Sequence, residues 1–138
     1  MEIKNQIYFY SFLSILFFLI GCTPIDRITY MNENTLGECE FTYAYDGREA
    51  LICIRDQTFD YMFFDLFLPY LDGSDLIKRT RKLEQHKGAN IFVISGNINY
   101  MARRCLKELH VTGLLDKPFT PDKFKEMIEN PQKELFDK

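Results

Sequence analysis

The chain is poor in the residues that build zinc sites and disulfide frameworks. Its 138 residues include two histidines, His86 and His110, and four cysteines. The cysteines are widely scattered, at positions 22, 39, 53 and 105. No zinc-type spacing follows from these positions. We interpret the thiols as reduced core residues of a cytosolic protein, with Cys22 as a separate case.

A strong positive charge is also missing. The formal net charge is -3, which gives no support for nucleic-acid binding. The largest basic cluster, residues 78–82, alternates in a way that suits a solvated helix face. There is no internal repeat and no low-complexity segment. What remains is 46% apolar and 27% charged, the composition of one globular domain with a real core.

One long apolar run, residues 7–20, allows several interpretations. Lys4 precedes it and Gly21-Cys22 follow it, the order found in a secretory signal. Residues 19–22 also look like a bacterial lipoprotein processing box, with Cys22 as the lipidated residue and the membrane as a partner of residues 7–22. The run is short for a full membrane span. Alternatively, its second half, residues 13–20, is a buried central strand, and we favour that interpretation.

Strands and helices are predicted to alternate five times. Thr23-Pro24, and later Thr120-Pro121, are typical helix openings. The expected strands cover residues 15–20, 40–45, 60–65, 89–95 and 111–115, and the expected later helices cover 50–56, 74–84, 98–109 and 120–130. This alternation predicts a parallel sheet with right-handed crossovers and helices on both faces. We expect residues 1–12 to be an extension of unclear role, 13–130 the domain, and 131–138 a polar tail.

The central feature is the stretch from Asp60 to Gly73. It begins as a short, aromatic-rich apolar run, typical of a buried parallel strand, and that run ends on Asp65. Ligand sites in open α/β sheets lie beyond the carboxyl ends of the strands. A carboxylate at that place can accept phosphate, ligate a metal, act as a base, or merely cap the strand.

Two further polar residues follow neighbouring predicted strands. Ser95 ends the fourth strand and Lys117 follows the fifth, so both are expected to face the crevice at Asp65. A carboxylate oxygen can attack phosphorus. A lysine ammonium can neutralise phosphoryl oxygens, and a hydroxyl can donate to one of them. Taken alone, Ser95 is a strand-end hydroxyl and Lys117 a surface salt bridge; the three together favour a site.

With these motifs the chain resembles the receiver domain of bacterial two-component response regulators. The resemblance covers residues 13–130 and rests on four motifs: residues 46–51 (DGREAL), residues 65–73, Ser95-Gly96 and Lys117-Pro118-Phe119. The separations of Ser95 and Lys117 from Asp65, 30 and 52 residues, match that family.

The resemblance implies a flavodoxin-like fold with five parallel strands in the order 2-1-3-4-5. It also implies phosphorylation of Asp65 by a histidine kinase or phosphotransfer protein, with Mg²⁺ assisting, and a downstream output protein. The chain would then be a phosphorelay signalling module in the cytoplasm and not an enzyme.

Two departures from the family pattern bear on this function. A gapless count from Asp65 puts the usual metal-binding acidic pair at Ile20-Gly21, which leaves Asp65 and the Phe67 carbonyl as metal donors. We therefore expect weak Mg²⁺ binding. The usual switch aromatic is replaced by Leu114.

These departures leave alternatives open. One is a phosphorylation-independent pseudo-receiver that acts as a protein interaction module. Another is a lipoprotein-like form tethered through residues 7–22. An unrelated fusion at the first dozen residues, or a decayed gene, is a third.

Overall fold

The computed structural model describes residues 5–10, 39–67, 70–96 and 98–131. In chain order, the elements are β1 (Asn5–Tyr10), β2 (Cys39–Ala44), α3 (Gly47–Asp56), β3 (Tyr61–Phe64), α4 (Gly73–Arg81), the short 3₁₀ helix η2 (Glu84–His86), β4 (Asn90–Ser95), α5 (Tyr100–Glu108), β5 (Gly113–Asp116) and α6 (Pro121–Glu129). None of the helices within these ranges is long and apolar enough to cross a membrane.

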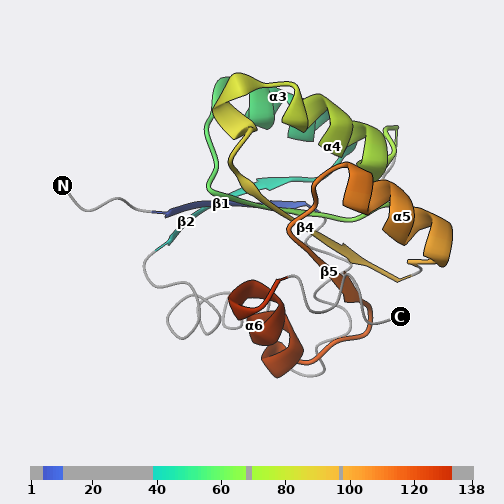
Figure 1. Ribbon diagram of the computed structural model, residues 1–138. Helices are drawn as coiled ribbons and strands as arrows, with labels where there is room; N and C mark the ends of the chain where they lie inside the picture. Colours follow the sequence, from blue (N-terminus) through green and yellow to red (C-terminus); the bar gives the residue numbers. More distant parts are fainter. Residues whose placement is uncertain (1–4, 11–38, 68–69, 97, 132–138) are drawn as a thin grey trace.

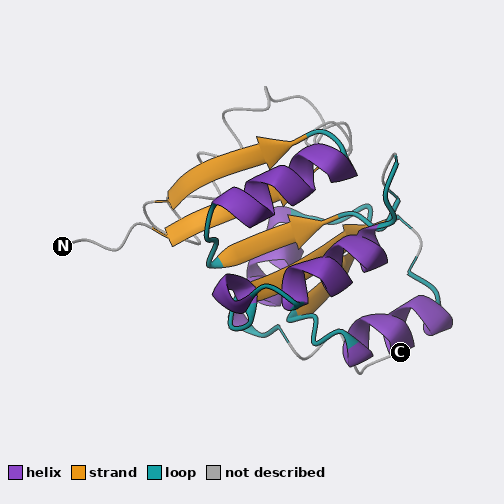
Figure 2. Cartoon of the chain, turned by 90° about the horizontal axis from the view of Figure 1, so that it is seen from above, coloured by secondary structure: helices purple, strands orange, loops and turns teal. Residues whose placement is uncertain are grey.

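The strands form one parallel sheet in the order β2-β1-β3-β4-β5. Helices α3, α4 and α5 cover one face and α6 covers the other (Figure 1), and the view from above shows the three helices lying along the strands (Figure 2). The predicted parallel α/β fold with helices on both faces is confirmed. All strands therefore direct their carboxyl ends to the same edge.

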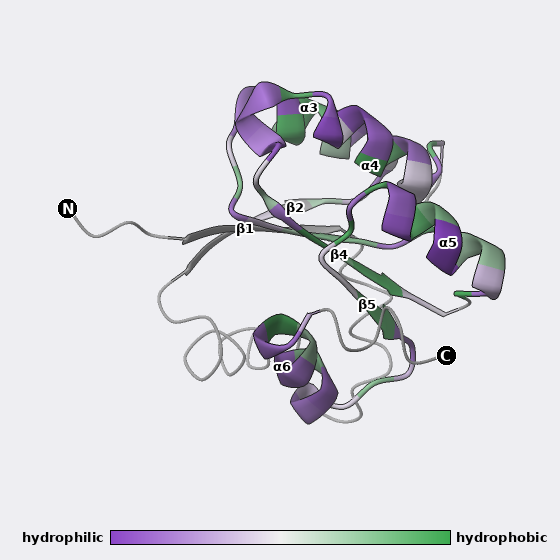
Figure 3. Cartoon of the chain, in the orientation of Figure 1, coloured by the Kyte–Doolittle hydropathy of each residue, from purple (hydrophilic) through white to green (hydrophobic). Residues whose placement is uncertain are grey.

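Alternating side chains of β3 and β4 build two separate cores. Met62, Phe64, Ile91 and Val93 pack with the α3, α4 and α5 side, whereas Phe63, Phe92 and Ile94 pack with α6. Successive residues of a strand point to opposite faces, so a strand covered on both sides must be apolar throughout. Figure 3 shows hydrophobic colouring in the middle of β4 and β5, while the helices carry many hydrophilic residues.

Each of the four described α-helices begins at a side chain that caps its free N–H groups. Asp46 accepts from the N–H groups of Arg48 and Glu49 at the start of α3. Asp72 caps α4, Asn99 caps α5, and Thr120 caps α6 ahead of Pro121. These residue types are the preferred N-caps. The helix opening predicted at Thr120-Pro121 is confirmed.

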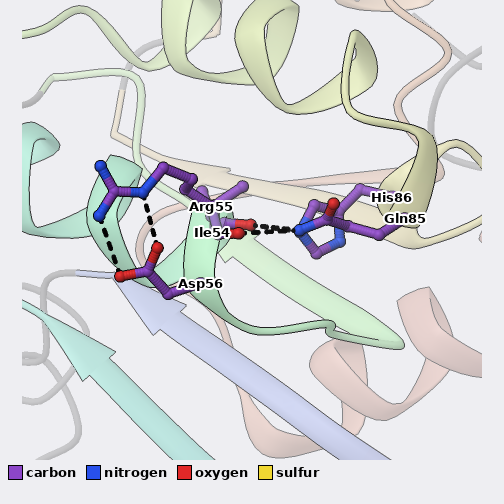
Figure 4. Close-up of polar contacts among 5 residues, drawn as sticks. All are labelled: Ile54, Arg55, Asp56, Gln85 and His86. Atoms are coloured by element: carbon purple, nitrogen blue, oxygen red, sulfur yellow. Dashed lines mark hydrogen bonds and ion pairs between the residues drawn. The ribbon is translucent and has the colours of Figure 1, made fainter.

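The carboxyl end of α3 is capped by side chains from η2 (Figure 4). His86 Nε2 lies 2.7 Å from the Ile54 carbonyl oxygen, and Gln85 Nε2 donates to the carbonyls of Ile54 and Arg55 at 3.2 and 3.1 Å. The His86 ring is fully buried and stacks on Phe59. The last carbonyls of a helix lack partners within the helix, so these contacts fix η2 against α3.

Arg81, at the end of α4, joins the segment before β4 and the loop before β5 through its guanidinium. It donates to the carbonyl oxygens of His86, Lys87 and Ala89, and to that of His110 at 2.7 Å. Burial lowers the pKa of Arg81, because a desolvated cation is less stable. The side chain thus replaces water as the partner of four backbone carbonyls before β4 and β5.

The predicted position of the first strand was wrong. We expected it at residues 15–20, within a domain beginning at residue 13, but the strand between β2 and β3 is Asn5–Tyr10. Residues 11–38 lie outside the described ranges, and with them the helix predicted after Thr23-Pro24. A strand buried on both faces has no polar alternation to fix its position, so several windows of the run 7–20 satisfy the same pattern.

Met101 does not lie in the core. It has helical spacing with Ile98 and Cys105, which is typical of an apolar helix face, but its side chain is 68% exposed. Asn99 begins α5 so close to Met101 that this residue lies in the first turn, together with the exposed Tyr100. Helical spacing identifies a face, but not how far a packed neighbour extends along it.

Candidate functional site

Asp65 directly follows β3, and its side chain lies at the carboxyl edge of the sheet. The residue is 8% exposed, so the carboxylate is largely removed from water. A buried carboxylate is stable only with hydrogen-bond and charge partners. Those partners come from the ends of β4 and β5 and from the loop after β3.

Three groups contact the Asp65 carboxylate. Lys117 Nζ lies 2.7 Å from Oδ2, and the Ser95 hydroxyl donates to Oδ1 at 3.0 Å. The backbone N–H of Phe67 also donates to Oδ1, at 3.1 Å. The structure thus brings together Asp65, Ser95 and Lys117, the three residues selected from the sequence. Both carboxylate oxygens have partners.

The sheet sets the position of Ser95 and Lys117. Ser95 is the last residue of β4 and is paired with Asp116 in β5. The Lys117 N–H donates to the Ser95 carbonyl at 2.9 Å, which continues the ladder by one residue. The Lys117-Pro118 peptide bond is cis. The ammonium and the hydroxyl therefore reach Asp65 from adjacent strands.

Gly73 packs against the backbone of Asp65 and Leu66 and so fixes the loop that follows Asp65. The Gly73 N–H donates to the Leu66 carbonyl at 3.1 Å. A Cβ at this glycine would lie 2.2 Å from the Asp65 carbonyl oxygen, far inside van der Waals contact. Any other residue at position 73 must displace the backbone of Asp65. The glycine that ends the stretch 60–73 therefore has a steric role.

Large side chains with apolar surface are exposed after β2, after β3 and in the first turn of α5. Phe67 is 68% exposed and Tyr70 is 76% exposed, and the guanidinium carbon of Arg48 lies 4.8 Å from the Tyr70 ring centroid. Tyr45, Tyr100 and Met101 are also exposed beside the carboxyl ends of β2 and β4. Sequence reasoning missed the Arg48–Tyr70 contact, because nothing in the spacing pairs the start of α3 with the loop after β3.

The position at which the family usually has a switch aromatic holds a buried leucine here. Leu114 is fully buried in β5 and packs in the core shared with α3, α4 and α5. Two residues later, Asp116 accepts from Arg103 of α5 at 2.6 Å. That ion pair ties α5 to the residue before Lys117. It gave no signal in the sequence, because α5 has three basic residues, Arg103, Arg104 and Lys107, and the spacing does not distinguish among them.

The described residues around Asp65 offer few ligands for a divalent cation. Mg²⁺ in proteins is usually bound through one or two carboxylates, with waters in its remaining positions. Within the described ranges no three His, Cys, Asp or Glu side chains are grouped to hold a metal ion. The sequence also has no Asp or Glu from residue 11 to residue 25, directly after β1. The roles of Asp65 and of the Phe67 carbonyl as metal donors stay predictions.

Ile20 and Gly21, where we placed the missing acidic pair, lie outside the described residues. The first strand ends at Tyr10, and residues 11–38 after it also lie outside the described ranges. The sequence has no Asp or Glu from residue 11 to residue 25, and weak Mg²⁺ binding stays a prediction.

Comparison with known proteins gives one consistent family. The sequence profile described as the response regulator receiver domain matches residues 29–129. The chemotaxis protein CheY of Pseudomonas aeruginosa is 29% identical over 100 residues, which is 70% of this chain and 81% of that protein. The probable transcriptional regulator ycf29 of Porphyra purpurea is 32% identical over 89 residues, which is 63% of this chain and 42% of that protein.

The chain thus spans less than half the length of the Porphyra regulator. Among solved structures, a CheY-like response regulator receiver domain protein from Methanospirillum hungatei has the same fold. Its TM-score is 0.73 at 19% identity, with 96% of each chain covered.

Proposed function

This chain belongs to the family of response regulator receiver domains, and from that premise we propose that Asp65 accepts a phosphoryl group in two-component signalling. The observation that carries the proposal is the convergence of Lys117 Nζ and the Ser95 hydroxyl on the two oxygens of Asp65. Domains of this family are signalling modules, so the product of the reaction is a changed surface and not a released metabolite.

The proposed transfer follows from the roles of these three side chains. An oxygen of the Asp65 carboxylate attacks phosphorus, the new P–O bond forms, and the bond from phosphorus to the donor breaks. With a phosphohistidine donor that bond is P–N, and the departing imidazole takes a proton from solvent. The Lys117 ammonium leaves the carboxylate and contacts a phosphoryl oxygen. The Ser95 hydroxyl donates a hydrogen bond to a second phosphoryl oxygen.

The partners in this proposal are of two kinds. A histidine kinase or phosphotransfer protein supplies the phosphoryl group at the carboxyl edge of the sheet. An output protein recognises the altered surface. We place the reaction in the cytoplasm.

A second candidate function is a phosphorylation-independent interaction module of the same fold. The observation that favours it is the saturated state of Asp65: both oxygens already have donors, and the chain has no Asp or Glu from residue 11 to 25. In this module the Asp65–Lys117 pair would be a fixed structural element. The two functions differ in one measurable property, the uptake of phosphate.

Intact mass spectrometry after incubation with acetyl phosphate or phosphoramidate tests the choice. We expect the wild type to gain the mass of one phosphoryl group and Asp65→Asn to gain none. Asp122→Asn, which changes an exposed carboxylate in the first turn of α6, is the matched control and should behave as the wild type. A wild type that never gains the mass, with either donor or with a phosphorylated kinase, would favour the interaction module.

A further inference from the structure

Arg103 of α5 forms an ion pair with the residue that precedes Lys117. Its Nη2 atom donates to Asp116 Oδ2 at 2.6 Å, and the two side chains are 14% and 41% exposed. The side chains of the surface pair Lys78–Asp75 are 48% and 54% exposed. Because water screens exposed charges, the pair formed by Arg103 is the stronger constraint of the two.

The alternation of side chains along β5 explains where this pair lies. Leu114 packs in the core shared with α3, α4 and α5, whereas Leu115 packs in the core shared with α6. Successive residues of a strand point to opposite faces, so Asp116 points to the side of α5. β5 is an end strand of the sheet, and its ladder partner is β4, where Ser95 is paired with Asp116. Arg103 therefore holds the end of β5 from the helix layer, whereas the sheet holds it from one side.

Lys117 continues directly from this anchored strand end. Its N–H donates to the Ser95 carbonyl at 2.9 Å, and its ammonium lies 2.7 Å from Asp65 Oδ2. A lysine side chain loses rotamer freedom when its ammonium is held in one place, so a shift of the backbone from which it extends favours its release. The contact between Lys117 and Asp65 thus depends on the exact position at which β5 ends.

We propose that Arg103 is a positioning residue of the Asp65 site: through Asp116 it fixes the end of β5 and so keeps the Lys117 ammonium on the Asp65 carboxylate. Arg103 belongs to α5, so the position of this helix and the state of the site are linked. The statement about Lys117 holds for both candidate functions, whereas an effect of Arg103 on phosphoryl transfer rests on the proposed function.

The methylene signals of Lys117 next to Nζ, followed by ¹H–¹³C NMR, test the position of the ammonium. Asp65→Asn removes the charged partner and defines the signal of the released lysine. We expect Arg103→Met to move the Lys117 signal at least half of the way from the wild-type position to that reference. Arg104→Met changes the neighbouring, 68% exposed arginine and is the matched control, which should leave the signal in place. An unmoved Lys117 signal in Arg103→Met would overturn the proposal.

Two further variants separate the ion pair from a general disturbance of α5. Asp116→Asn leaves α5 unchanged and should move the Lys117 signal in the same direction as Arg103→Met, and it replaces that variant if Arg103→Met does not fold. Arg103→Lys keeps the positive charge without the guanidinium fork, so it should move the signal less than Arg103→Met. An unmoved signal in Asp116→Asn, or equal movement in Arg103→Lys and Arg103→Met, would overturn the ion pair as the cause.

Initial rates of phosphoryl uptake from phosphoramidate, followed by intact mass, test the consequence for transfer. We expect Arg103→Met and Asp116→Asn to lower the rate by about threefold or more, because a displaced ammonium stabilises the phosphoryl oxygens less well. Arg104→Met should leave the rate unchanged. Equal rates in all variants would overturn the effect on transfer. A wild type without uptake would instead defeat the proposed function, and the Lys117 signal would still decide whether Arg103 positions the ammonium.

Discussion

At the scale of single residues, Lys117 has the largest electrostatic role in the site. It forms a buried ion pair with Asp65, and removal of one member leaves the other charge without compensation. We expect Lys117→Met to lower the free energy of unfolding by about 3–5 kcal/mol. Urea denaturation measures this. The double variant Lys117→Met with Asp65→Asn should recover much of the loss, and a double variant as unstable as the single one would contradict a charge effect.

A second prediction at this scale concerns Arg81. Its guanidinium reaches carbonyls in the loop before β4 and in the loop before β5, a geometry that the single ammonium of lysine cannot reproduce. Arg81→Lys should lower the free energy of unfolding by roughly 1.5–3 kcal/mol, the worth of one charged hydrogen bond. Arg79→Lys, on the exposed side of the same helix, is the control and should leave thermal unfolding unchanged. Equal effects of the two substitutions would argue against the carbonyl contacts.

At the scale of elements, β3 carries the core of the domain. Phe64 is buried and paired with the fully buried Val93 of β4, as the sequence pattern predicted. Phe64→Ala should cost about 3–5 kcal/mol of unfolding free energy, because it empties a closed core position. Phe67→Ala, three residues later and mostly exposed, should change it by no more than about 0.5 kcal/mol. Chemical denaturation of both variants compares the two costs, and similar values would contradict the assigned faces.

Elements that combine a strong local pattern with a clear end were predictable. β3 and β4 are short aromatic or aliphatic runs that stop at Asp65 and Ser95, and the parallel sheet then brings those ends together. The position of β1 was not predictable, because the apolar run in this part of the chain is longer than one strand. The Arg103–Asp116 pair and the His86 contact with α3 were beyond sequence reasoning as well, since each depends on the packing of distant segments.

At the scale of the whole molecule, β1 lies between β2 and β3 and holds the two parts of the sheet together. A chain beginning at Cys22, as lipoprotein processing would produce, lacks this strand, and β2 then has no neighbour. We expect such a truncated protein to give no dispersed NMR spectrum, whereas the full chain gives one and remains in the soluble fraction. A well-folded protein starting at residue 22, or a lipidated Cys22 in membranes, would contradict this.

The central place of β1 also has a consequence during protein synthesis. β1 leaves the ribosome first, but Phe64, at the end of its neighbour β3, lies 54 positions after Tyr10. At about 5–20 residues per second, the apolar run waits roughly 3–11 s for that neighbour. During this interval the edge of β1 that pairs with β3 stays open to targeting factors and chaperones, even after β2 has been translated. Folding and capture by such factors therefore compete by their rates before Asp65 has been translated.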